Sequence, residues 1–198
     1  MIFSNPSIQK DDLQILRKNL ECIGIREIGI WKELVLRDES LFSEIYSLMY
    51  CDNRRLAWHA AWVIDHVSEA SPEKLERYVP EMIEELPKLK SSALRRHFTR
   101  MLLSQRIPEN QMGHLVNDLY DLLTPAEDIA VRANALQLLY NLSLSVPELQ
   151  PELISVIETI LEDDLTPGML SKARRILSSL GFNDVKIPQR RGLKQCPK

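Results

Sequence analysis

The 198-residue chain holds 25 lysines and arginines against 28 aspartates and glutamates, which gives a formal net charge of −3. This length suits one domain with a sizeable core, or about five helical hairpins of a repeat array. The mildly acidic total argues against a polycation that would coat nucleic acid without sequence preference, so any such binding needs local segregation of charge.

The first third of the chain predicts three helices. The first follows residues 5–6, with Gly24 closing it in the left-handed conformation. The second spans residues 27–37. The third is capped by Ser40 and ends near Cys51.

Proline-glutamate steps announce several of the later helices, because a proline N–H would have no intrahelical acceptor in the first turn. Scarce glycine and abundant leucine, glutamate, arginine and alanine also favour helix. Seven further helices are predicted, at residues 54–68, 72–88, 92–105, 108–123, 128–144, 148–163 and 168–180. The total is about ten helices and an all-α fold.

The Pro-Glu steps at residues 72, 108 and 147 recur after 36 and 39 residues, the length of a helix-turn-helix unit. Connections of two to five residues force successive helices to run antiparallel. No Pro/Gly-rich linker interrupts the array, so we expect one helical domain over residues 1–182. Residues 183–198 form a basic tail with little apolar periodicity, which we expect to be flexible.

Residues 128–139, DIAVRANALQLL, resemble the turn and second helix of a HEAT repeat, with Asp in the turn, Val-Arg at the helix start and Ala and Leu on the buried face. Residues 52–62 are similar, and residues 94–98 are a looser copy. The resemblance implies a right-handed α-solenoid of about five antiparallel helix pairs. Its motifs are degenerate, so they specify fold far better than function.

In HEAT-like arrays the pattern-bearing helix is the inner one and lines the concave face. The resemblance therefore implies inner helices near residues 54–68, 92–105, 129–144 and 168–180, and outer helices near 40–51, 72–88, 108–123 and 148–163. Arginines gather on the inner set and acids on the outer set. Guanidinium groups match carboxylate and phosphate, so the inner face is expected to bind an acidic or phosphorylated partner.

Arginines at inner helix starts also pair with turn aspartates in these repeats, which predicts the structural pairs Arg54–Asp52 and Arg132–Asp128. The group Arg95, Arg96 and Arg100 exceeds what a single structural pair needs, so binding and structural roles stay equally open for it.

Trp58, Trp62 and Asp65 lie at i, i+4 and i+7, on one helical stripe. They form either an aromatic and acidic patch that contacts a ligand, or part of the core. His59 lies on another face together with His66 and is either a ligand contact or hydrogen-bonded within the fold. Two histidines seven residues apart do not make a metal site by themselves.

We expect no catalytic residues, metal or cofactor. The three cysteines lie 29 and 145 residues apart, unlike zinc or disulfide spacings, and no phosphate loop, nucleophile elbow or HExxH motif is present. No apolar stretch approaches the roughly 20 residues of a membrane span, and no signal peptide is evident. We therefore expect a cytoplasmic protein.

The leading hypothesis is a non-enzymatic scaffold that binds an unknown protein partner. The alternative is a nucleic-acid-binding protein resembling the HEAT-repeat alkylpurine DNA glycosylases, and an array that dimerises through an apolar end face is a third reading. The oligomeric state stays open. The candidate binding residues are Arg55, Trp58, His59, Trp62, Asp65, Arg95, Arg96, Arg100, Arg174 and Arg175.

Overall fold

The structure, a computed structural model, describes residues 10–162 and 166–182, and the basic tail lies outside this part of the chain. All regular secondary structure in the described part is helical, which confirms the predicted all-α fold. The α-helices are α1 (Lys10–Glu21), α2 (Ile28–Arg37), α3 (Glu39–Leu48), α4 (Arg54–Ala70), α5 (Val79–Glu85), α6 (Ser92–Leu102), α7 (Glu109–Asp121), α8 (Ile129–Ser145), α9 (Gln150–Glu162) and α10 (Pro167–Ser179). Three 3₁₀ helices join them, η1 (Pro72–Tyr78), η2 (Leu86–Lys88) and η3 (Pro147–Leu149).

Two helix ends differ from the prediction. Asp38, not Ser40, caps α3, because its carboxylate accepts the backbone N–H of Ser40 at 2.9 Å and of Leu41 at 3.1 Å. Gly24 does not take the left-handed conformation, which Gly181 alone adopts among the described residues. Instead, the Gly24 N–H donates to the Glu27 carboxylate at 2.8 Å.

The single helix predicted over residues 72–88 is divided into η1, α5 and η2. Pro80 and Pro87 cause the division. Each proline removes a backbone donor and crowds the carbonyl four residues before it, so an uninterrupted α-helix cannot form. Each proline instead sits in the first turn of a new helical segment.

The predicted pairs Arg54–Asp52 and Arg132–Asp128 are wrong, since neither occurs among the ion pairs of the described residues. Asp128 is the N-cap of α8, and its carboxylate accepts the Ala130 N–H at 2.8 Å. Asn53 performs the same role for α4. The unpaired N–H groups at a helix start attract these side-chain oxygens more directly than an arginine does.

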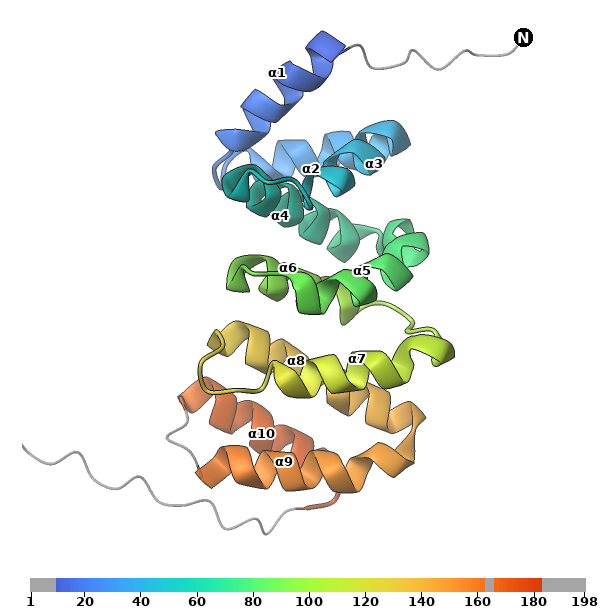
Figure 1. Cartoon of the computed structure of the whole chain (residues 1–198), viewed down its shortest axis with the longest axis vertical. Helices are drawn as coiled ribbons and strands as arrows, with labels where there is room; N and C mark the ends of the chain where they lie inside the picture. Colours follow the sequence, from blue (N-terminus) through green and yellow to red (C-terminus); the bar gives the residue numbers. More distant parts are fainter. Residues whose placement is uncertain (1–9, 163–165, 183–198) are drawn as a thin grey trace, which may run out of the picture. The chain divides into compact units, whose positions relative to one another are not determined.

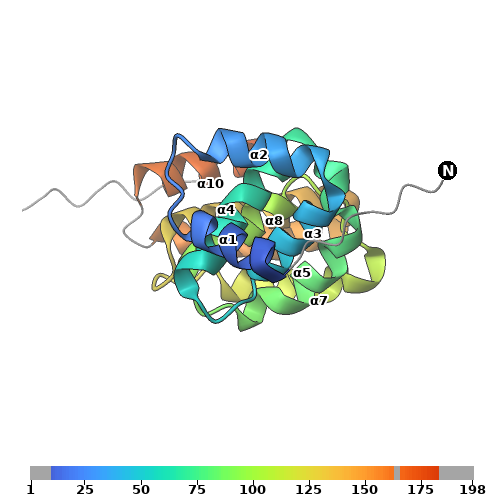
Figure 2. The same ribbon diagram turned by 90° about the horizontal axis from the view of Figure 1, so that it is seen from above.

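The chain divides into two compact units, residues 1–108 and 109–198. In the first, α4 is the central helix and packs against α1, α2, α3 and α6. Seen from above, α1 to α3 lie over α4 (Figure 2). The apolar side of α4 is fully buried, and Phe98 and Leu102 of α6 close the core beside it.

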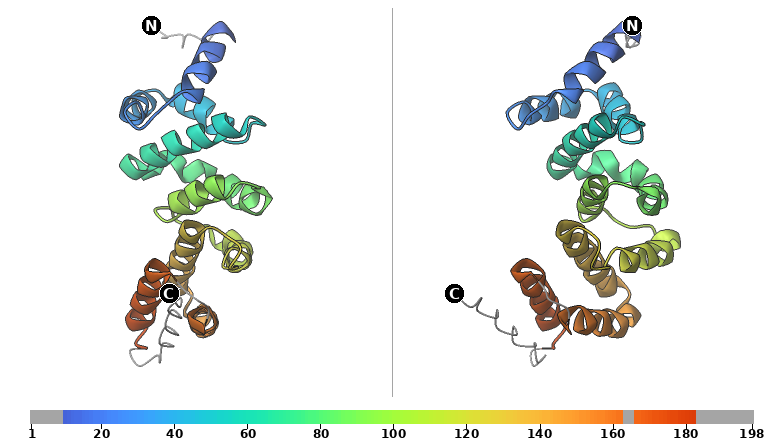
Figure 3. Two further views of the ribbon diagram at one scale, coloured as in Figure 1. Left: turned by 90° about the vertical axis from the view of Figure 1, so that its left-hand side faces the viewer. Right: turned by 60° about the vertical axis from the view of Figure 1, so that its left-hand side comes forward.

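In the second unit, α8 is the central helix and packs against α7, α9 and α10 (Figure 1). Its core residues Val131, Leu136 and Leu139 are buried between these neighbours. Within each unit the predicted inner helices lie next to one another, α4 beside α6 and α8 beside α10 (Figure 3). The right-handed sense of the solenoid and the single domain over residues 1–182 stay predictions.

Candidate functional site

The candidate site in the first unit is built on the side of α4 that carries the two tryptophans. Leu56, Val63 and Val67 anchor the opposite side of the helix in the core. Trp58 and Trp62 are half-buried, and their rings stack with centroids 6.0 Å apart and planes 6° from parallel. The two stacked rings thus form a partly exposed aromatic surface. This result is intermediate between the two alternatives predicted from the sequence, a ligand-contacting patch and part of the core.

His66 extends this surface by one turn. The Trp62 indole N–H donates to Nε2 of His66 at 3.1 Å. An indole can only donate, so Nε2 carries no proton in this arrangement and Nδ1 faces the Glu69 carboxylate, 3.5 Å away. The imidazole is therefore a bridge between the aromatic pair and the end of α4.

Asp65 is only 2 % exposed and ties α4 to α6. Its Oδ2 lies 2.8 Å from Nδ1 of His97, and its Oδ1 lies 3.4 Å from Nε of Arg100. Arg100 also reaches Glu69, with 3.3 Å between Nη2 and Oε2. The buried Asp65 carboxylate is therefore paired with His97 and Arg100 in a charge-assisted network.

For two of the candidate binding residues, Asp65 and His59, the structure supports the alternative in which the side chain belongs to the fold. Asp65 is enclosed by α6, and His59, also 2 % exposed, lies 2.8 Å through Nδ1 from the carbonyl of Leu20. Burial lowers the pKa of His59, and its hydrogen bond to the Leu20 carbonyl opposes that effect in part. Neither side chain is offered to a ligand at the surface, so both contribute to the fold.

The arginines fall into two groups. Arg55 of α4 and Arg96 of α6 are exposed, and Arg95 is half-buried beside the Lys90 carbonyl. Arg174 and Arg175 are exposed on α10 of the second unit. Arg55 therefore lies on the same helix as the two tryptophans, whereas Arg174 and Arg175 belong to the other unit.

Next to Arg175, the half-buried Lys172 donates to Oε1 of Gln137 at 2.9 Å, which links α10 to α8. Burial lowers the pKa of Lys172, and the nearby positive charge of Arg175 lowers it further.

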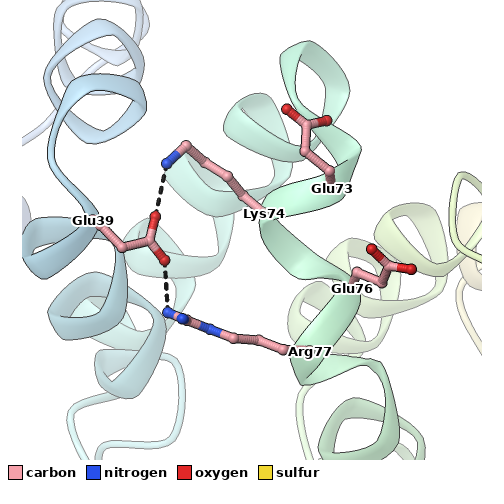
Figure 4. A pocket seen from close by; sticks show the side chains of 5 residues that line it. All are labelled: Glu39, Glu73, Lys74, Glu76 and Arg77. Atoms are coloured by element: carbon pink, nitrogen blue, oxygen red, sulfur yellow. Dashed lines mark hydrogen bonds and ion pairs between the residues drawn. The ribbon is translucent and has the colours of Figure 1, made fainter.

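A second charged cluster was missed by the sequence analysis (Figure 4). Glu39 at the start of α3 accepts from Lys74 at 2.8 Å and from Arg77 at 2.6 Å, both on η1. The Arg77 guanidinium lies 4.7 Å from the centroid of the Tyr78 ring. Glu39, Lys74 and Arg77 line a cavity of about 410 Å³ together with Glu73 and Glu76. No sequence signal relates Glu39 to cations 35 residues later, because the contact arises only when α3 and η1 pack.

Among the described residues, no three or more His, Cys, Asp or Glu side chains are grouped so that they could hold a metal ion. Within the same part of the chain, no helix combines the length and apolarity needed to cross a membrane.

Comparison with known proteins identifies the repeat. A family model described as a HEAT repeat domain matches residues 14–180, which is most of the chain and covers both units. No curated protein matches the chain. No solved structure matches it either. The matched range includes the three HEAT-like segments at residues 52–62, 94–98 and 128–139, and the chain therefore belongs to the HEAT repeat family.

Proposed function

We propose that this protein is a non-enzymatic interaction scaffold whose inner helices bind an acidic or phosphorylated segment of a partner protein. HEAT repeats serve generally as protein-interaction scaffolds, and the match covers most of the chain. The finer proposal, a preference for negative charge, follows from how charge is divided between the two sets of helices.

That division carries the proposal. The α-helices of the predicted outer set, α3, α5, α7 and α9, hold eleven acidic residues and no lysine or arginine. The 3₁₀ segments of the same set, η1 and η2, add two glutamates and three cations, Lys74, Arg77 and Lys88. Each of these cations pairs with a glutamate of α3 or α5. The predicted inner helices α4, α6, α8 and α10 hold nine lysines and arginines and two acidic residues. Both inner acids, Asp65 and Glu69, are engaged by Arg100. The inner helices therefore carry an excess of positive charge that the net charge of the chain hides.

The residue types suited to a contact surface are present on α4 as Arg55, Trp58 and Trp62. Arginine and tryptophan are enriched among the residues that dominate the binding energy of protein interfaces. A half-buried, stacked tryptophan pair is held rigid and loses little conformational entropy when a partner covers it. Arg55 lies one turn before this pair and is exposed, so it can pair with a carboxylate or phosphate while the rings cover apolar atoms.

The test measures binding of a labelled phosphoserine peptide, flanked by glutamate and leucine, by fluorescence anisotropy. Its reference is the same peptide with serine. We expect the phosphopeptide to bind, and Arg55→Ala to weaken binding by about tenfold, the loss of one charge-assisted pair. Lys88→Ala is the matched control, because it removes an exposed cation from the 3₁₀ turn η2 of the same unit. Equal weakening by both variants, or no preference for the phosphopeptide, would contradict the proposal.

The stacked tryptophans are the one observation that favours nucleic-acid binding, since aromatic faces stack bases without sequence preference. The glycosylase-like reading also needs an acidic residue facing the nucleic acid, and Asp65 is instead enclosed by His97 and Arg100. Titration of labelled duplex DNA at two salt concentrations separates the two functions. Salt-dependent binding that Arg95→Ala, Arg96→Ala and Arg100→Ala together abolish would favour the nucleic-acid reading.

A further inference from the structure

The second unit contains a pocket among its acidic outer helices, whereas the site proposed above for an acidic segment lies on the inner helices. The pocket has a volume of about 500 Å³ and is formed by the first half of α7, the end of α8, η3 and the start of α9. Figure 1 shows α7 and α9 one below the other, with the connection from α8 to α9 beside the start of α7. The size suits a few side chains of a peptide.

The lining combines apolar and polar groups. Met112, Val116, Val146 and Leu149 supply apolar surface. Hydrogen-bonding groups come from the side-chain amides of Asn110 and Asn117, the imidazole of His114 and the carboxylate of Glu152. An apolar surface bordered by a few polar groups is the usual make-up of a recognition site, because the apolar part gives affinity and the polar part fixes orientation.

The surroundings of this pocket are unusually acidic. Residues 109–162 contain nine acidic residues and one arginine, Arg132, which is buried on α8. The segments that form the pocket's outer walls, α7, η3 and α9, contain no lysine or arginine at all. Burial raises the pKa of Asp118, the neighbouring Asp121 raises it further, and His114 opposes the rise in part, so two acids of α7 lie close together beside one imidazole. These walls contain no lysine or arginine, and their one basic side chain is the imidazole of His114, so the acidic excess would be complemented by a positively charged partner.

Gly113 lies in the interior of α7 and lines the pocket. A glycine inside a helix costs about 0.5–1 kcal/mol relative to alanine. A Cβ atom at this position would meet no atom within 4 Å. Packing against the rest of the chain does not require the glycine, and the missing side chain leaves the pocket open.

We propose that this pocket is a second binding site, which takes a basic, apolar-anchored peptide segment of a partner protein. A leucine-sized side chain of the segment packs against Val116 and Leu149, and a lysine or arginine next to it pairs with Glu152. The amides of Asn110 and Asn117 hydrogen-bond to the peptide backbone. The acidic helices carry this site, so it is independent of the arginine-bearing surface and its ligand has the opposite charge.

The test uses the full chain and a labelled peptide of the sequence KLGKLGKLGK, with two reference peptides. One carries glutamine for every lysine, and the other carries serine for every leucine. Fluorescence anisotropy should show binding of the first peptide only. Equal binding of the serine peptide would overturn the proposal, because charge alone would then explain the association.

Matched variants locate the contact. Gly113→Leu and Gly113→Trp place a side chain in the pocket and should abolish binding, whereas Gly113→Ala, which adds a single methyl, should retain it. Glu152→Gln should weaken binding by about three- to tenfold, and Glu158→Gln, an exposed acid of α9 outside the pocket, by less than twofold.

Circular dichroism verifies that each variant is folded, and Glu152→Gln decides the question if either large Gly113 substitution is not. Full binding by folded Gly113→Trp, or equal losses in the two glutamine variants, would overturn the site. Tighter peptide binding after Arg190→Gln and Arg191→Gln would also overturn it, since the chain's own tail would then be the occupant.

Discussion

Asp65 is the residue on which the contact between α4 and α6 depends most. Its carboxylate faces both His97 and Arg100, and its removal would leave the buried His97 imidazole without this acceptor and Arg100 with Glu69 as its remaining partner. We expect Asp65→Ala to lower the free energy of unfolding by about 3–5 kcal/mol, measured by urea denaturation. Glu69→Ala, which removes the exposed acid of the same network, should cost about 1 kcal/mol or less. Similar losses of unfolding free energy in the two variants would show that the buried contact contributes no more to stability than the exposed one.

His59 makes the stability of the first unit depend on pH. Burial lowers its pKa in the folded state, so the unfolded chain binds the proton more readily. The stabilisation from a neutral His59 is present above the unfolded pKa of about 6.5 and is lost as pH falls toward the folded value. Between pH 7 and pH 5 the wild type should therefore lose stability faster than His59→Gln, by at most about 1.4 kcal/mol per pH unit. Parallel pH profiles of the two proteins would exclude His59 as the source.

The spacing of Trp58, Trp62 and Asp65 was enough to predict that they share a stripe of one helix, and they do. It could not predict that the tryptophans stay half-buried while Asp65 is enclosed. The difference arises because α6 covers the Asp65 end of the stripe, and helical periodicity contains no information about where a neighbouring helix crosses. His97 lies in the looser copy of the repeat over residues 94–98, and together with Arg100 of the same helix it closes this contact.

At the scale of elements, the turn aspartates of the repeat have unequal roles. Asp128 caps α8 through the Ala130 N–H, whereas Asp52 precedes α4, whose cap is Asn53. We expect Asp128→Ala to lower the free energy of unfolding by about 1 kcal/mol, within the range of 0.5–2 kcal/mol for N-cap removal. Asp52→Ala should change it by less than about 0.5 kcal/mol. Thermal denaturation of both variants provides the comparison, and an equal loss would mean that position in the repeat matters more than the cap.

Helix starts were predictable because proline, aspartate and asparagine act locally, within a single turn. The Pro-Glu steps at residues 72 and 147 do begin helical segments, η1 and η3. The interior of the segment over residues 72–88 was not predicted, because its apolar periodicity continues through Pro80 and Pro87 while the backbone hydrogen bonds do not. Periodicity reports which residues are buried, and it does not report whether the intervening hydrogen bonds are α or 3₁₀.

At the scale of the whole molecule, charge is distributed unevenly between the sets of helices, and this distribution underlies both proposed sites. A net charge of −3 would have predicted a weakly acidic and unselective surface. The lysines and arginines of α4, α6, α8 and α10 are instead the basis of the site we propose for anionic segments, and the acidic helices of the second unit are the basis of the site we propose for cationic segments. A scaffold with two such surfaces can hold two partners of opposite charge together, because the sites lie on different helices.

The division into two compact units predicts that stability is not shared evenly along the chain. In repeat arrays each element contacts only its neighbours, so a loss of packing spreads over a limited range. Leu136 is fully buried in α8, and Leu136→Ala should cost about 2–5 kcal/mol. Native-state hydrogen exchange should then accelerate in α7 to α10 and stay unchanged in α4, while Phe98→Ala in α6 should give the reverse pattern. Equal acceleration everywhere in either variant would mean that the two units unfold as one cooperative body, the behaviour expected of a short array whose helices form a single continuous core.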